Sequence, residues 1–175
     1  MKTKLFFALI LIALLVAPLW AKGPNGPSTS PGLTDLEKAN ILYLFEEEKL
    51  AHEVYVKMYE EWGANIFDII SQSEERHMNS VENLIYKYGL DDTVVTNGSE
   101  VFTNDVLGGK YIDLRDEGYK GLKSALEVGV KIEEMDIDDI ERMLEKTDKP
   151  DITRVLNNLL DGSNNHLDAF ETHLQ

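Results

Sequence analysis

Residues 71–81, SQSEERHMNSV, decide the fold class of this chain. Glu74 and His77 stand three residues apart in this stretch, and apolar residues on either side recur at intervals of three and four. That interval places side chains on one face of a helix. The face that carries Phe67 and Val81 also carries Glu74 and His77, so a carboxylate and an imidazole share the apolar side of this helix. The stretch therefore predicts a polar site inside a helical core.

The N-terminus has the organisation of an export signal. Lys2 and Lys4 precede an apolar run that ends at Trp20, and a small residue, Ala21, follows. This pattern predicts a signal peptide at residues 1–21 and an extracytoplasmic location, either secreted or at the cell surface. Leu19 is not the small residue preferred before such a cleavage site, so a retained N-terminal anchor is the alternative.

The rest of the chain is expected to form one linker and one folded domain. Residues 22–33 are rich in Gly, Pro and Ser and predict a flexible linker. Residues 34–175 follow as a single domain, for which a chain of 175 residues with 43% hydrophobic content is large enough. The chain has no cysteine, which excludes disulfides and thiolate metal sites. Its formal charge of −15 argues against nucleic acid and anionic membrane surfaces as partners.

Helical periodicity defines four long segments and a connection between the second and the third. Thr34 and Glu37 form a capping-box pattern at the start of the first. The predicted long helices are 34–61, 65–88, 122–146 and 152–175. Residues 90–121 form a long crossover with a short helix near 104–117, and no segment has a clear strand pattern. This order predicts an all-α fold, a ferritin-like four-helix bundle with a long crossover between helices 2 and 3.

Each long helix carries acidic or histidine residues in the middle of its apolar face. Unpaired, buried ionised carboxylates cost several kcal/mol each. Two divalent cations would cancel four carboxylate charges, and a set of oxygen and imidazole ligands suits iron, with manganese as the alternative. The residues that we predict as ligands of two transition-metal ions are Glu48, Glu74, His77, Glu133, Asp136 and His166.

Two segments resemble the ligand segments of rubrerythrins. EKLAHEVY at residues 48–55 is similar to their first-helix segment, and EERH at 74–77 is similar to their second-helix Glu-x-x-His. The whole stretch 34–175, including EEEKLAHEVY, SEERHM, GVKIEEMDIDDIE and GSNNHLDAF, resembles an uncharacterised ferritin-like family, a domain of unknown function. The resemblance implies the fold and a metal site, and it does not bring an activity.

The chain departs from the rubrerythrin pattern in three respects. Ser163 stands where a fourth-helix glutamate is expected, while Glu133-x-x-Asp136 supplies a second carboxylate on the third helix. Asp136 is shorter than glutamate and leaves a coordination position for water, O₂ or peroxide. A four-cysteine electron-transfer module is absent, so a catalytic cycle needs an external electron donor.

These observations favour a dinuclear-metal, most simply di-iron, oxidoreductase that acts on peroxide or O₂. A non-catalytic metal-binding or iron-handling protein is the first alternative, and a metal-free extracytoplasmic interaction domain is the second. No separate catalytic acid or base is identifiable, and a homodimer is expected only because ferritin-like bundles often pair.

The remaining polar and aromatic candidates have simpler interpretations. Glu46, Glu47 and the pair 60–61 are expected on a solvated face, with Glu47 as the substitute ligand if Glu48 points away. His52 is expected near the site without binding metal, or on the surface. We expect His173 to be solvated, and Tyr43 and Tyr55 to be core aromatics. The alternative for one of the two tyrosines is a hydrogen-bond donor to a ligand residue, or a redox partner.

Overall fold

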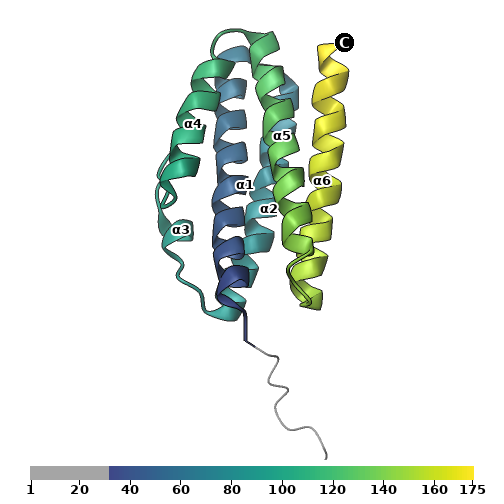
Figure 1. Cartoon of the computed structure of the whole chain (residues 1–175). Coiled ribbons are helices and arrows are strands. Elements are labelled where there is room, and N and C mark those ends of the chain that lie inside the picture. The colour runs from purple at the N-terminus through teal and green to yellow at the C-terminus, as the bar shows by residue number, and fades with distance from the viewer. Residues whose placement is uncertain (1–31) are drawn as a thin grey trace, which may run out of the picture. The chain divides into compact units, whose positions relative to one another are not determined.

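A computed structural model describes residues 32–175, and all regular secondary structure in this range is helical (Figure 1). The helices are α1 (Asp35–Trp62), α2 (Asn65–Tyr88), α3 (Thr93–Thr96), α4 (Asp105–Gly118), α5 (Leu122–Leu144) and α6 (Pro150–Leu174). The predicted signal peptide at 1–21, and the predicted linker apart from its last two residues, lie outside the described residues.

Local sequence signals set the ends of the helices. At the start of α1, the Thr34 hydroxyl accepts a hydrogen bond from the backbone N–H of Glu37, and the Glu37 carboxylate accepts one from the backbone N–H of Thr34. Helices α1 and α2 end at Gly63 and Gly89, whose φ angles of 64° and 61° are left-handed and favour glycine. Pro150 occupies the first turn of α6. The predicted boundaries of the long helices are confirmed to within a few residues.

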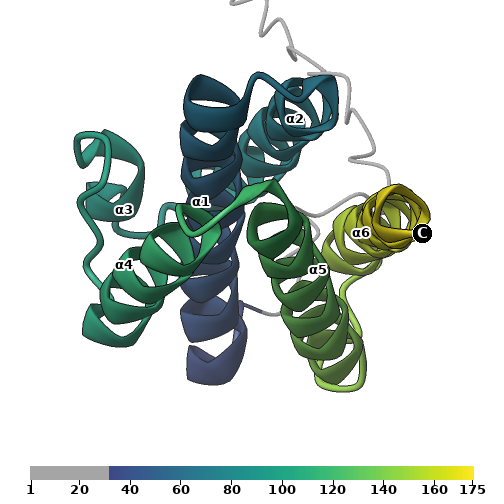
Figure 2. The same ribbon diagram turned by 90° about the horizontal axis from the view of Figure 1, so that it is seen from above.

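The four long helices form two neighbouring pairs, α1 with α2 and α5 with α6. Figures 1 and 2 show α3 and α4 on one side of α1, with α2 and α5 on the other sides. The prediction of a long crossover that contains a helix is confirmed, whereas the four-residue helix α3 was not predicted. Within residues 32–175, every helix is too short or too polar to cross a membrane.

The apolar core consists of two clusters at different levels along the helices. We call them the Phe170 cluster and the Leu156 cluster, after a fully buried member of each. The Phe170 cluster includes Leu50, Val54, Tyr55, Phe67, Ile70, Ile132 and Phe170. The Leu156 cluster includes Ile41, Leu44, Val81, Leu84, Ile140, Leu156 and Leu159. On each long helix the predicted ligand positions fall between the two clusters, so a polar layer interrupts the core.

Helix α1 is covered on the side that faces the crossover as well as on the side that faces the core. The Lys49 ammonium donates hydrogen bonds of 2.8 Å to the backbone carbonyl oxygens of Gly98 and Val101. The buried Glu53 carboxylate accepts a hydrogen bond from the backbone N–H of Glu100. These contacts fix the crossover on α1 by its backbone.

The adjacent Glu46 also holds the crossover. Its carboxylate accepts hydrogen bonds from the backbone N–H groups of Thr103 and Asn104, immediately before α4. The prediction that Glu46 and Glu47 lie on a solvated face is wrong, because both are buried, with 2% and 1% of their surface exposed. The periodicity of α1 cannot report that a crossover covers its second face.

Candidate metal centre

The structure brings all six predicted ligand residues into the polar layer between the two clusters. Each is buried, and none exposes more than 9% of its surface. They come from all four long helices: Glu48 from α1, Glu74 and His77 from α2, Glu133 and Asp136 from α5, and His166 from α6. Their positions near the middle of each helix therefore do place them at one level, as the sequence indicated.

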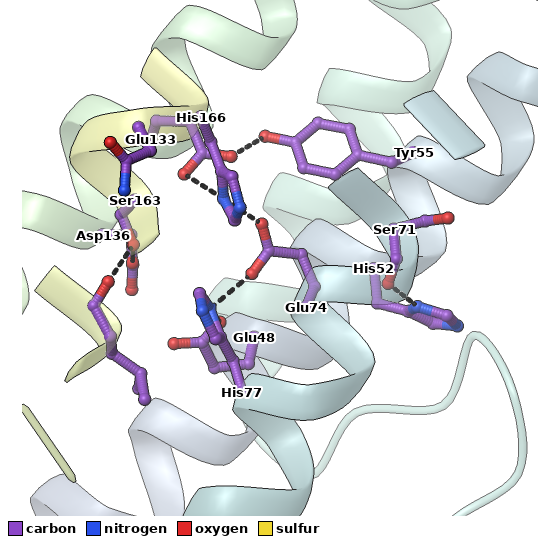
Figure 3. A network of polar contacts seen from close by, with 12 residues as sticks. Glu48, His52, Tyr55, Ser71, Glu74, His77, Glu133, Asp136, Ser163 and His166 are labelled. Atoms are coloured by element: carbon purple, nitrogen blue, oxygen red, sulfur yellow. Dashed lines mark hydrogen bonds and ion pairs between the residues drawn. The ribbon is translucent and has the colours of Figure 1, made fainter. Parts of the chain in front are cut away.

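Glu74 lies at the centre of this arrangement (Figure 3). One of its carboxylate oxygens is 2.7 Å from His77 Nδ1, and the other is 2.8 Å from His166 Nδ1. His77 Nδ1 also lies 3.2 Å from Glu48 Oε2, and His166 Nδ1 lies 3.5 Å from Glu133 Oε2. The residues thus form two groups, Glu48–Glu74–His77 and Glu74–Glu133–His166. Glu74 belongs to both groups, and within each group the ligand atoms lie within 4.8 Å of one another.

The two imidazoles stack across the layer, with ring centroids 5.5 Å apart and planes inclined by 27°. The absence of a side chain at Gly162 of α6 makes room for the imidazole of His77. A Cβ atom on Gly162 of α6 would lie 2.5 Å from His77 Nε2, well inside van der Waals contact. Gly162 therefore permits an orientation in which His77 directs Nδ1 towards Glu48 and Glu74.

Two hydroxyl groups orient the carboxylates of α5. The Tyr55 hydroxyl donates a hydrogen bond of 2.6 Å to Glu133 Oε1, and the Ser163 hydroxyl donates one of 2.5 Å to Asp136 Oδ2. Asp136 belongs to neither three-residue group, but it lies beside both. Ser163 occupies the position where a fourth-helix glutamate was expected. It supplies a hydrogen-bond donor to Asp136, whereas a glutamate there would have supplied a metal ligand.

Several buried polar atoms of the layer have no hydrogen-bond partner. They are both carboxylate oxygens of Glu47, together with Glu48 Oε1, Glu74 Oε1, Asp136 Oδ1 and His166 Nδ1. Although Glu74 Oε1 and His166 Nδ1 are only 2.8 Å apart, they are not aligned as a donor and an acceptor. Two ligand atoms at a right angle around an ion, each about 2.1 Å from it, would be about 3 Å apart. The donor set and these unpartnered atoms fit a bound cation.

Burial raises the pKa of the layer's carboxyl groups. Burial and the charge of Glu74 raise the pKa of Glu133 to about 8. Burial also raises the pKa of Asp136 to about 7, against the lowering effect of the Ser163 hydrogen bond. The pKa of Glu48 is raised well above its ordinary value by burial and by the charge of Asp136. Without a cation, these groups favour their protonated forms.

For the two imidazoles and Glu74, by contrast, the pKa shifts favour the charged forms. Burial alone would lower the pKa of His77 and of His166, but the neighbouring carboxylates outweigh it and raise the two values to about 11 and about 9. Burial opposes ionisation of Glu74, yet contacts with both imidazoles lower its pKa to about 2. Protons on the imidazoles thus provide the positive charge that Glu74 requires, and metal binding must displace these protons.

The histidines and the tyrosine that were not predicted as ligands belong to neither of the two three-residue groups. His52 lies apart from the layer in Figure 3, and its Nδ1 is 2.8 Å from the backbone carbonyl of Ser71. His173 is exposed, as predicted, and Tyr55 is a core aromatic, as predicted. Its hydrogen bond to Glu133 corresponds to the alternative role that the sequence left open for Tyr43 or Tyr55, that of a donor to a ligand residue.

Sequence reasoning treated Glu47 as a surface residue, although a signal for its burial was present. Glu47 follows Leu44 by three residues and precedes Leu50 by three, and both leucines are in the core. Residues at this spacing share a face of a helix. The run of three glutamates at 46–48 concealed that α1 buries all three in different directions.

Comparison with known proteins identifies the family of this chain. Residues 37–175 match the uncharacterised protein domain DUF2202. The chain belongs to the DUF2202 family. The matched range begins in the first turn of α1 and includes the other helices and every residue of the polar layer.

One relative of this DUF2202 chain is the uncharacterised protein MJ0754 of Methanocaldococcus jannaschii. It is 41% identical over 138 residues, which cover 79% of this chain and 75% of the relative. The crystal structure of the hypothetical protein MJ0754 superposes with a TM-score of 0.79 at 39% identity, and the alignment covers 86% of this chain and 83% of that one.

A more distant solved structure shares the fold alone. It is a DUF305 fragment from Deinococcus radiodurans, which superposes on this DUF2202 chain with a TM-score of 0.62 at 13% identity. The alignment covers 82% of this chain and 98% of the fragment. The resemblance to an uncharacterised domain family is confirmed, whereas the likeness to rubrerythrins stays a prediction.

Proposed function

We propose that this DUF2202 protein is a ferritin-like four-helix protein that binds two divalent transition-metal ions and reacts with peroxide or O₂. Iron is the favoured metal, and manganese is the alternative. The ligands would be Glu48, Glu74 and His77 for one ion, and Glu74, Glu133 and His166 for the other. Asp136 would complete the set from α5.

The observation that carries this proposal is the position of Glu74 between two imidazoles. A carboxylate with one oxygen beside each of two Nδ1 atoms is well placed to bridge two ions. The inventory of carboxylates and imidazoles from four helices corresponds to that of dinuclear carboxylate proteins. The unpartnered Glu48 Oε1 supplies a further ligand position for the same ions.

A bound pair of ferrous ions would supply two electrons, enough with two protons to reduce one hydrogen peroxide molecule to two water molecules. The chain's own residues prepare the site for this chemistry. Tyr55 and Ser163 fix the carboxylates of Glu133 and Asp136 by hydrogen bonds. The Phe170 and Leu156 clusters close the layer from both sides and limit access of water.

Return of electrons needs a partner outside the domain. The chain has no cysteine and so offers no thiolate cluster for electron transfer. We propose a separate protein or a small reductant as the donor. The N-terminal sequence supports an extracytoplasmic location. We also propose a homodimer, only because ferritin-like bundles often form dimers.

The decisive experiment is anaerobic loading with Fe²⁺ followed by rapid mixing with hydrogen peroxide or O₂. Wild-type protein should oxidise rapidly and develop near-ultraviolet absorption typical of a ferric pair. H77A should bind less iron and lose the rapid phase, because one ion would lose its only imidazole. H52A is the matched control, since His52 lies apart from the layer, and it should oxidise as wild type does.

The same experiment separates the alternatives. Protein that binds two Fe²⁺ ions but stays ferrous with both oxidants would be a metal-binding or iron-handling protein without turnover. Apo-protein that rebinds neither Fe²⁺ nor Mn²⁺ would exclude the metal centre and favour a metal-free interaction domain. Elemental analysis of protein purified without chelators gives the first indication.

A further inference from the structure

Glu47 is a buried acid that is not among the six proposed metal ligands. Only 1% of its surface is exposed, and neither of its carboxylate oxygens has a hydrogen-bond partner. The adjacent Glu46 is equally buried, but two backbone N–H groups satisfy it. A buried carboxylate without a partner is costly, so its presence calls for a ligand or a counter-ion.

The register of α1 and α5 shows what Glu47 faces. The Tyr43 hydroxyl donates a 3.3 Å hydrogen bond to Asp139, and the Tyr55 hydroxyl lies 3.4 Å from the carbonyl oxygen of Gly129. Residue numbers thus rise along α1 as they fall along α5, so the helices are antiparallel. One turn beyond Tyr43 is Glu47, and about one turn before Asp139 is Asp136. Glu47 and Asp136 therefore lie opposite each other.

We propose that Glu47 and Asp136 bind a third divalent cation beside the two-metal centre. This inference rests on the proposed function, because Asp136 also adjoins that centre. The donors are the two free oxygens of Glu47 and the free Oδ1 of Asp136. Carboxylate oxygens without imidazole or sulfur favour a hard ion, and of the two metals proposed for the centre, Fe²⁺ and Mn²⁺, they suit Mn²⁺ better.

Both proposed ligands lie about one helical turn from residues that line a groove at the surface. A groove at the surface between α1 and α5 is lined by Tyr43, Asp139 and Arg142 among others. Asp139 holds Arg142 in an ion pair and accepts the Tyr43 hydrogen bond. Glu47 lies one turn of α1 from Tyr43, towards the polar layer. The third position is thus a stopping point for ions that pass from the groove to the two-metal centre.

Other charged groups near Glu47 do not neutralise it. Lys110 and Arg142 both act on it electrostatically, but Lys110 Nζ lies 2.8 Å from the Met135 sulfur and Arg142 pairs with Asp139. When ionised, Asp136 and Glu48 add negative charge to the same region. A divalent cation would satisfy both free oxygens of Glu47 and reduce this repulsion.

The test compares anaerobic Mn²⁺ binding to chelator-treated wild-type protein, E47Q and E134Q, with bound metal counted by equilibrium dialysis and elemental analysis. Wild type should bind three ions per chain and E47Q two. E134Q is the matched control, because Glu134 is an exposed acid of α5, and it should bind three. With Fe²⁺, E47Q should fill the two-metal centre several-fold more slowly than wild type does.

Each other outcome is decisive. Two ions in both wild type and E47Q would overturn the third position and leave the two-metal proposal standing, whereas no binding in wild type would overturn both. Loss of all metal in E47Q would make Glu47 a ligand of the centre itself. Equal filling rates would remove the role as a stopping point. If E47Q does not fold, anomalous scattering from Mn²⁺-soaked wild-type crystals decides, because a missing third peak between Glu47 and Asp136 overturns the proposal.

Discussion

Metal removal should make the stability of this protein strongly dependent on pH between about 5 and 8. The reason lies in Glu133 and Asp136, whose pKa values the fold raises from 4.5 to about 8 and from 3.8 to about 7. The folded apo-protein therefore holds these protons more tightly than the unfolded chain does. As the pH rises, the unfolded chain ionises first, and the free energy of unfolding falls until the folded pKa is passed.

The size of the effect follows from the pKa values. One pKa unit corresponds to about 1.4 kcal/mol, so a carboxyl whose pKa rises by about three units costs the fold about 4 kcal/mol once it is ionised. Glu133 and Asp136 both experience the charge of Glu74, so we count one such penalty as the minimum. For a domain of this size, about 4 kcal/mol corresponds to a fall in Tm of roughly 10 °C. His166 acts in the same direction, because its contribution is present below its ordinary pKa of 6.5 and is lost towards about 9.

The assay is thermal unfolding of chelator-treated protein at pH 5 and pH 8, with and without Mn²⁺. The apo-protein should melt roughly 10 °C lower at pH 8, and Mn²⁺ should restore most of the loss there but little at pH 5, where protons compete for the ligands. The variant E133Q/D136N should have a flatter pH profile without metal. Equal melting temperatures at the two pH values, with and without chelator, would refute the reasoning and would mean that these acids carry no such penalty.

Three substitutions test individual contacts. E74A should lose both ions of the two-metal centre, because Glu74 belongs to both groups, whereas H77A should lose one of them and H52A neither; elemental analysis distinguishes these results, and an E74A protein with full metal would exclude the shared ligand. G162A should lower metal affinity although it removes no ligand, since its new Cβ would displace His77; unchanged calorimetric binding would show that the helices separate instead. E46A should destabilise the protein by about 1–3 kcal/mol, because two buried N–H groups of the crossover lose their acceptor, and chemical unfolding measures the loss.

The sequence predicted the helices and the level of the polar layer for one physical reason. Periodicity reports which residues share a face, and on all four long helices a polar residue interrupts an apolar face near its middle. Glu74 and His77 are the clearest case, because apolar residues flank them on both sides. Such reasoning needs only the geometry of a single helix.

Periodicity within single helices could not predict how the helices face one another. That Glu74 is shared by both imidazoles depends on how α2 faces α6, and that Ser163 donates to Asp136 depends on how α6 faces α5. The burial of Glu46 was missed because its partners are backbone N–H groups of a crossover more than fifty residues away, which have no sequence signature. Contacts of this kind depend on the tertiary arrangement and leave no period in the sequence.

The double covering of α1 links the interior of the protein to its surface. Within one turn, Glu48 faces the polar layer while Glu46 and Lys49 hold the backbone of residues 98–104. A helix turn is too stiff for one of these side chains to move far without the others, so rotation of α1 on metal binding would shift its anchor points for the crossover. Thermodynamic linkage is reciprocal, and a partner that stabilises one position of the crossover would change the metal affinity by the same factor. Through the crossover, an outside partner could thus sense and set the occupancy of the proposed metal site without touching it.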